Sequence, residues 1–152
     1  MTEDLRAAAC RLLGWLETSP DGLHGLLCRW GIAAIFWRSG QTKVNGWSIN
    51  ETTFDLFRDE YRVPLLHPEF AAISATLAEH LFPVLLVVGL ASRLSAGALL
   101  VMTLVIQCFV YPGSWPDHLL WASALVYVLL RGPGAVSLDH LIRRAQPRFR
   151  RA

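Results

Sequence analysis

Two side chains of opposite charge, Arg29 and Glu79, stand within long apolar stretches of this 152-residue chain. A charged group in such surroundings loses its hydration unless another group satisfies it, so these residues are the first candidates for binding or proton chemistry. An arginine and a glutamate can neutralise each other, and the glutamate can also take up or release a proton. The elements that carry them must therefore bring them close to suitable partners.

The overall composition sets the environment of these charges. Hydrophobic residues make up 53% of the chain and charged residues 17%, and the net charge is only +2. A soluble domain of this size usually contains about a quarter charged residues. The composition indicates a single membrane domain over residues 1–152, and it excludes disorder and a nucleic-acid partner.

Apolar runs predict the fold class. A bilayer core about 30 Å thick needs about 20 apolar residues per helix. The sequence predicts four such helices, over about residues 22–40, 70–92, 94–111 and 118–131, with a basic tail over 132–152. We therefore expect an all-α, integral membrane four-helix bundle. An amphipathic N-terminal helix over 3–17 and a short helix over 51–61 in the outer loop should lie on the membrane surface.

The positions of arginine residues predict the orientation of these helices. Arg93 follows the second predicted helix, Arg131 ends the fourth, and five further arginines follow in the tail. The 112–117 loop, on the opposite side, has no basic residue. Because positive loops stay in the cytoplasm, we expect both termini on the cytoplasmic side.

Depth along the predicted helices suggests a partner for each buried charge. At about 1.5 Å per residue, Arg29 lies about 16 Å below the outer end of the first helix, and Glu79 lies about 15 Å below the outer end of the second. The two side chains should thus be level. We predict that Arg29 pairs with Glu79, either as a structural ion pair or as part of a proton-active site.

Other polar side chains gather toward the outer end of the predicted bundle. They are Arg38, Lys43, His80, Gln107, Asp117 and His118. Together with Arg29 and Glu79 they form the predicted ligand-binding set, which would suit a quinone head or a small oxyanion. We predict no metal site, because the histidines and cysteines lack the spacing of metal ligands.

Several short motifs resemble those of a known family. They are Arg29-Trp30-Gly31, Ala78-Glu79, Gly89-Leu90-Ala91-Ser92-Arg93, Asp117-His118, and Gly132-Pro133-Gly134 followed by Ser137-Leu138-Asp139. On these motifs the sequence resembles the DoxX family, small four-helix proteins of the bacterial inner membrane. Arg29, Lys43, Glu79 and His118 fall on positions that match the family pattern. The resemblance therefore implies a multi-pass inner-membrane protein.

The resemblance also implies a function. The founding member of the family is the small membrane subunit of a thiosulfate:quinone oxidoreductase, which suggests a redox-associated subunit with quinone as a possible cofactor. No thiol motif supports a self-sufficient enzyme. Expected partners are the lipid bilayer, other membrane or periplasmic proteins, and a second copy of the chain.

The outer segment of the chain suggests an alternative function. It resembles that of DoxX-like members encoded beside small metal-binding peptides, where the protein would be a non-enzymatic scaffold or export partner in a metal-stress or peptide-modification system. A third possibility is a small transporter, for which four spans would need a dimer.

Overall fold

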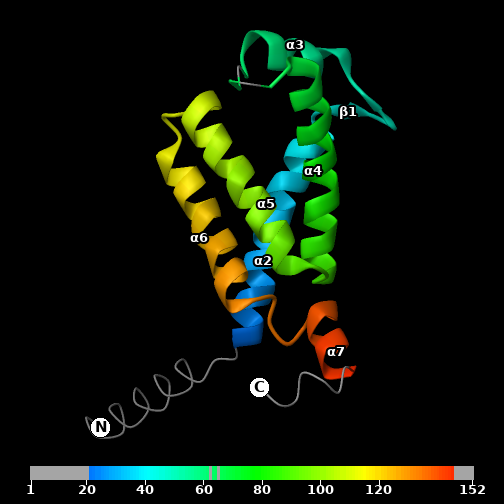
Figure 1. Ribbon diagram of the computed structural model, residues 1–152, viewed down its shortest axis with the longest axis vertical. Helices are drawn as coiled ribbons and strands as arrows, with labels where there is room; N and C mark the ends of the chain where they lie inside the picture. The colour runs from blue at the N-terminus through cyan, green and yellow to red at the C-terminus, as the bar shows by residue number, and fades with distance from the viewer. Residues whose placement is uncertain (1–20, 62, 65, 146–152) are drawn as a thin grey trace, which may run out of the picture.

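The computed structural model describes residues 21–61, 63–64 and 66–145, and this part of the chain is mostly helical (Figure 1). The predicted all-α class is confirmed. The helix predicted over 3–17 and the last seven residues of the basic tail lie outside the described residues.

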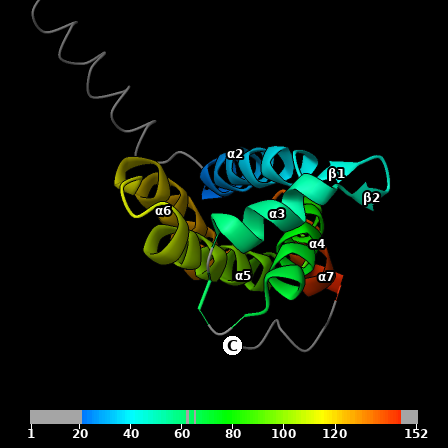
Figure 2. The ribbon, with the colours of Figure 1, turned by 90° about the horizontal axis from the view of Figure 1, so that it is seen from above.

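Four long helices run side by side. They are α2 (Asp21–Gln41), α4 (Pro68–Val88), α5 (Ser92–Val105) with its π-helical continuation η1 (Ile106–Val110), and α6 (Trp115–Arg131). These bounds lie close to the four predicted ranges. Contacts join α2 to α4, α4 to α5, α5 to α6 and α6 back to α2, so that α4 and α6 lie diagonally opposite each other (Figure 2).

The centre of this bundle is apolar and close-packed. Its buried residues come from all four helices and are Ile32, Ala33, Phe36, Leu86, Ala96, Leu99, Leu125 and Val128. Those of α2, α5 and α6 are spaced three or four residues apart along their helices, which is why these apolar runs form helices that pack through one stripe. The outward faces are also apolar, as exposed Leu77, Leu81, Val101 and Leu104 show.

Two of the helices are long and apolar enough to cross a membrane, judged by length and composition. They are α4 and the continuous helix over Ser92–Val110. The helix α2 carries the charges of Arg29 and Arg38, and α6 has only 17 residues. The crossing of a membrane by α2 and α6 therefore stays a prediction.

A hairpin and a short helix cover one end of the bundle, which we call the outer end after the predicted orientation; the opposite end is called the inner end. The strands β1 (Val44–Asn45) and β2 (Ser48–Ile49) pair antiparallel directly after α2. The helix α3 (Glu51–Asp59) then crosses above the bundle, as Figure 2 shows from above. This helix confirms the short helix predicted for the outer loop.

Local interactions explain where α3 begins and how it is held. The side chain of Asn50 caps the helix by accepting a hydrogen bond from the backbone N–H of Thr53. On the inner side of α3, Phe57 is buried against Ala71 and Ala72 of α4. The outer segment is thus fixed to the bundle through α4.

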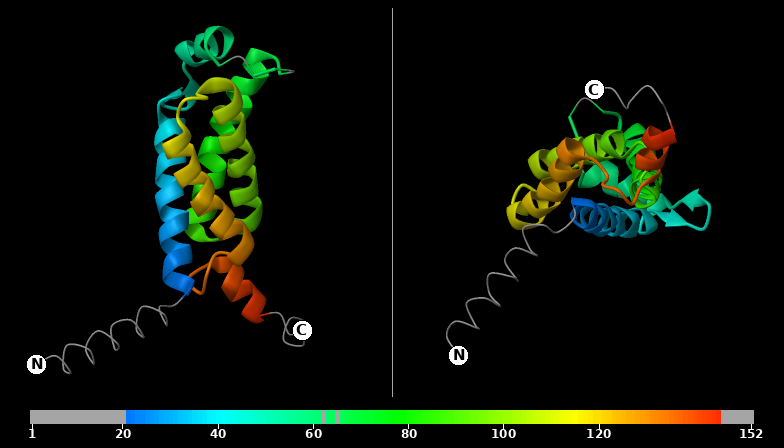
Figure 3. Two further views of the ribbon diagram at one scale, coloured as in Figure 1. Left: turned by 90° about the vertical axis from the view of Figure 1, so that its left-hand side faces the viewer. Right: turned by 90° about the horizontal axis from the view of Figure 1, so that it is seen from below.

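The opposite end of the bundle carries α7 (Leu138–Ala145). After α6 the chain crosses beneath the helices and leads into α7, which lies below α4 (Figure 3). The first part of the predicted basic tail is therefore an ordered connection and a helix.

Candidate functional site

A buried ion pair joins α2 to α4 near the outer end of the bundle. Lys43 follows α2 by two residues, and its Nζ lies 2.7 Å from Oε2 of Glu79 in α4. Ser39, one turn before Lys43, donates from Oγ to Oε1 of Glu79 at 3.2 Å. Lys43 is only 7% exposed and Glu79 only 3% exposed. The carboxylate therefore has both of its oxygens satisfied although it is removed from water.

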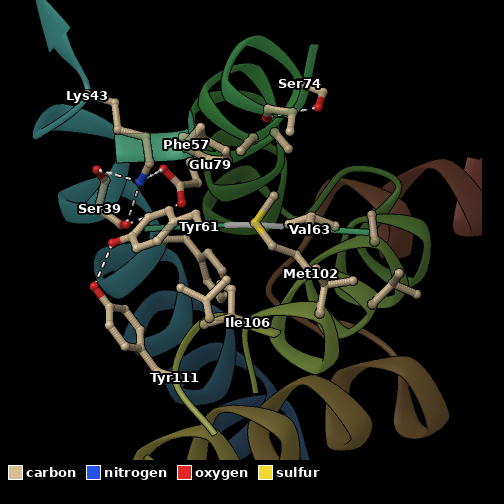
Figure 4. A pocket seen from close by; sticks show the side chains of 18 of the residues that line it. Ser39, Lys43, Phe57, Tyr61, Val63, Ser74, Glu79, Met102, Ile106 and Tyr111 are labelled. Carbon is tan, nitrogen blue, oxygen red and sulfur yellow. Dashed lines mark hydrogen bonds and ion pairs between the residues drawn. The ribbon is translucent and has the colours of Figure 1, made fainter. Parts of the chain in front are cut away.

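The pair forms part of the wall of a cavity of about 380 Å³ (Figure 4). Helices α2, α4, α5 and α6 supply the walls, and α3 with the segment after it supplies the outer edge. Most of the lining is apolar and includes Ile35, Phe36, Phe57, Ala75, Ala78, Val101, Met102 and Ile106. An apolar cavity with a few buried polar groups is the usual form of a small-molecule site.

His118 of α6 supplies a second buried polar group to this cavity. Its imidazole is only 4% exposed, and its Nδ1 lies 2.6 Å from Oε1 of Gln107. The other end of the Gln107 amide donates from Nε2 to the carbonyl of Pro112 at 2.7 Å, which fixes Oε1 as the atom facing His118. Nδ1 therefore carries the proton, and Nε2 is the ring nitrogen that can accept one.

The π-helical turn η1 places Gln107 behind His118. Turns of this type widen a helix locally and often occur at functional sites. The ring of Trp121, one turn after His118, meets the imidazole edge-on with 4.9 Å between ring centroids. His118 is thus held from two sides.

Two tyrosines lie at the outer edge of the cavity. The hydroxyls of Tyr61 and Tyr111 are 2.7 Å apart, and Tyr111 donates to Oε1 of Glu60 at 3.2 Å. Burial and the hydrogen bond to Tyr111 raise the pKa of Tyr61 above its usual value. This contact links the segment after α3 to the end of η1.

The predicted ligand-binding set is only partly assembled at this cavity. Lys43, Glu79 and His118 line it, and Gln107 supports His118 from behind. Sequence reasoning missed Ser39 and the Tyr61–Tyr111 contact. Ser39 could have been found from its position one helical turn before Lys43, whereas no sequence signal connects two tyrosines 50 residues apart.

Three other predicted residues lie elsewhere. His80 contacts α2, because its Nε2 lies 3.0 Å from Nε2 of Gln41, while its Nδ1 donates to the Thr76 carbonyl of its own helix α4 at 2.7 Å. The side chains of Arg38 and Asp117 are exposed and make no hydrogen bond or ion pair with the described part of the chain. These three side chains do not line the cavity.

The predicted pairing of Arg29 with Glu79 is wrong. Arg29 is fully buried near the inner end, where Nη1 donates to the Leu86 carbonyl at 2.9 Å and Nη2 donates to the Val136 carbonyl. The prediction failed because it set the outer ends of α2 and α4 level. Gly40 at the end of α2 instead lies against Glu79 and His80, so that α4 extends about 16 Å farther outward.

Arg29 belongs to a second cluster that closes the inner end of the bundle. The last carbonyls of α4 accept from its guanidinium, as the free carbonyls of a helix C-terminus favour a cation. Gly89 follows with φ +75°, and a Cβ on it would lie 2.4 Å from Nη1 of Arg29. Its carbonyl accepts from the backbone N–H of Asp139 at 2.9 Å. Arg29 therefore binds α4 to the chain that leads into α7.

Asp139 connects α7 to the start of α5 at the inner end of the bundle. Its two carboxylate oxygens accept from the backbone N–H groups of Ala91 and Ser92, each at 2.9 Å, at the start of α5. Gly134 packs against Gly22, with 2.8 Å from an added Cβ to the Gly22 Cα. The glycine and Ser-Leu-Asp motifs singled out in the sequence thus form one structural joint at the inner end, far from the cavity.

Comparison with protein-family models gives one match, in which residues 24–112 correspond to DoxX. The chain belongs to the DoxX family. The matched range of this DoxX protein contains Arg29, Lys43 and Glu79 but ends before His118 and the last motifs. No curated protein and no solved structure matches the chain. DoxX membership and the apolar helices together point to a membrane protein.

Proposed function

We propose that this chain is a redox-associated integral membrane subunit that binds a quinone or a related small ligand in the outer cavity. The observation that carries the proposal is the apolar cavity of about 380 Å³ with two buried polar groups in its wall, the Lys43–Glu79 pair and His118. This volume falls in the range of about 300–1,000 Å³ that is typical of small-molecule sites.

The chemistry of the lining supports a ligand with a polar head and an apolar body. Glu79 and the Nε2 of His118 can hydrogen-bond a head group and exchange protons with it, which a quinone needs when it is reduced or oxidised. Val101 lines the cavity and is also 62% exposed on the outside of the bundle. An apolar tail could leave the cavity there, toward the hydrocarbon of a bilayer.

The same proposal includes an orientation in the bacterial inner membrane. All four long helices would cross it, with the α3 end outside and both termini in the cytoplasm. Basic side chains support this direction, because Arg93, Arg131, Arg143 and Arg144 are exposed at the α7 end. The positive-inside rule assigns that end to the cytoplasm.

Retention of quinone through purification tests this function. The full chain is purified from membranes in a mild detergent, and its bound lipids are extracted and analysed by chromatography. We expect quinone to remain with the protein at up to one molecule per chain. Quinone no more abundant than in an unrelated membrane protein purified in parallel would contradict the proposal.

A non-enzymatic scaffold or export partner in a metal-stress or peptide-modification system is the second candidate. The observation in its favour is α7, whose Leu141 and Ile142 are 58% and 46% exposed on a helix that also carries Arg143 and Arg144. If this role holds, another membrane protein should co-purify with the wild type and be lost from a Leu141→Asp/Ile142→Asp variant that keeps its fold.

A further inference from the structure

The hydrogen-bond donors of the polar side chains in the cavity wall are largely used within the protein. The ammonium of Lys43 has three N–H groups, and it contacts Oε2 of Glu79, Oγ of Ser39 and the Ser39 carbonyl at 2.7, 3.1 and 3.4 Å. The Ser39 hydroxyl in turn donates to Glu79. Ser74 of α4 also lines the cavity, and its hydroxyl donates to the Ala71 carbonyl at 3.1 Å.

The same holds for the other polar groups of the wall. The proton on Nδ1 of His118 is directed to Gln107. At the outer edge, Tyr111 donates to Glu60, so the hydrogen between the two tyrosine hydroxyls comes from Tyr61. Among the side chains of described residues that line the cavity, only that of Trp121 retains an N–H that makes no hydrogen bond to the protein.

What remains available to a ligand is mainly lone pairs. Each oxygen of the Glu79 carboxylate accepts one hydrogen bond from the protein and can accept another. Nε2 of His118 accepts none from the part of the chain that the structure describes. A carbonyl ligand would place its own lone pairs against these acceptors and leave them unsatisfied, which is costly in a buried site.

The two buried acceptors also stand on opposite walls. Glu79 belongs to α4 and His118 to α6, and these helices are diagonal in the bundle, with α2 and α5 between them (Figure 2). Apolar side chains such as Phe36, Met102 and Ile106 line the same cavity. A ligand that uses both therefore carries donors at opposite ends of an apolar body.

We propose that the cavity selects ligands that donate hydrogen bonds from both ends, and that among quinone-type molecules it holds the dihydroxy, reduced form in preference to the dicarbonyl, oxidised form. This preference rests on the proposed function, since it assigns the redox state of the ligand at the same site. The protein would then bind quinol selectively and would not bind the reduced and oxidised forms equally.

Binding of three molecules that share one ring tests this preference. They are durohydroquinone, duroquinone and the dimethyl ether of durohydroquinone, each titrated anaerobically into the detergent-purified full chain. We expect the hydroquinone to bind at least about tenfold more tightly than either of the others, because only it supplies two O–H donors. The preference for durohydroquinone over the other two ligands should shrink in the Glu79→Gln and His118→Phe variants. It should persist in the Asp117→Asn variant, because Asp117 is exposed and does not line the cavity.

The possible failures are distinct. If duroquinone binds as tightly as durohydroquinone or more tightly, the preference for donors is wrong while the cavity remains a quinone site. If none of the three binds, the proposed function and the preference both fail. The comparison among the three ligands uses the wild-type protein, so it decides the question even if a variant does not fold.

Discussion

The ammonium of Lys43 lies 2.7 Å from Oε2 of Glu79, and this contact joins a residue just beyond α2 to the middle of α4. The pair connects the end of α2 to α4 and forms a polar part of the cavity wall. Both charges are removed from solvent, so each depends on the other for its stability.

Removal of one partner of this pair should be strongly destabilising. Lys43→Met leaves the Glu79 carboxylate buried without a counter-ion, and we expect it to lower the free energy of unfolding by about 3–5 kcal/mol. Replacing both partners, in Lys43→Met/Glu79→Leu, should restore much of that loss because no buried charge remains. Denaturant titration in detergent micelles measures both effects.

A surface ion pair provides the matched control. Arg58 contacts Asp55 and Glu69 at 3.3 and 3.1 Å, and all three side chains are at least half exposed. Arg58→Met should therefore cost less than about 1 kcal/mol. A loss for Lys43→Met no larger than for Arg58→Met would contradict the account of a buried pair.

Arg29 and Glu79 should act independently of each other. Arg29→Met leaves the carbonyls of Leu86 and Val136 without their donor, and we expect a loss of about 3 kcal/mol in unfolding free energy. Because the two residues lie about 15 Å apart along the bundle, the effects of Arg29→Met and Glu79→Gln should add to within about 0.5 kcal/mol. A double-mutant cycle with a coupling of about 2 kcal/mol or more would instead support a direct ion pair.

Gly89 should not tolerate a side chain. Its φ is +75°, and a Cβ would meet Nη1 of Arg29 at 2.4 Å and the Cβ of Ser137 at 2.6 Å. Gly89→Ala should therefore lower the melting temperature clearly, by opening the joint between α4 and the chain before α7. Gly31→Ala is the control, since nothing lies within 4 Å of its added Cβ; it should be neutral or raise stability by about 0.5–1 kcal/mol. Equal effects of the two changes would refute this explanation.

Asp139 should make stability depend on pH on the acid side. Desolvation raises the pKa of its carboxyl, but the hydrogen bonds from the N–H groups of Ser92 and Ala91 outweigh it and hold the pKa below the ordinary value of 3.8. Its contribution is therefore complete above the unfolded pKa and is lost as the pH falls through the lower folded pKa. Thermal unfolding between about pH 6 and 2 should show a shallower acid loss for Asp139→Asn. An unchanged slope would show that the carboxylate does not hold the start of α5.

Local sequence patterns predicted the elements of this fold well. The apolar runs gave the four long helices to within a few residues, since burial of one stripe decides where a helix forms. The aromatic stripe of residues 51–61 likewise predicted α3, which Asn50 caps and Phe57 anchors.

The offset between α2 and α4 could not be read from the sequence. It depends on how the hairpin and α3, which connect the two helices, pack over the end of the bundle, and this packing allows α4 to begin beyond the end of α2. The pairing of Arg29 failed for this reason, and Glu79 received Lys43 as its partner instead. Glu79 could still be selected as a candidate, because a charged side chain in an apolar stretch needs a partner wherever that partner lies. Lys43 and His118 could be selected because they gather with other polar side chains at the same end of the predicted bundle.

Filling the cavity tests the central claim that its ligand lies there. Ala78 lines the cavity, so Ala78→Phe should occupy the ligand's space while leaving every polar side chain of the wall in place. Ala34→Phe makes the same change on the exposed face of α2 and is the control. We predict that quinone per purified chain falls at least about tenfold in Ala78→Phe and stays at the wild-type value in Ala34→Phe. Equal quinone content in the wild type and a folded Ala78→Phe variant would contradict a ligand site in this cavity.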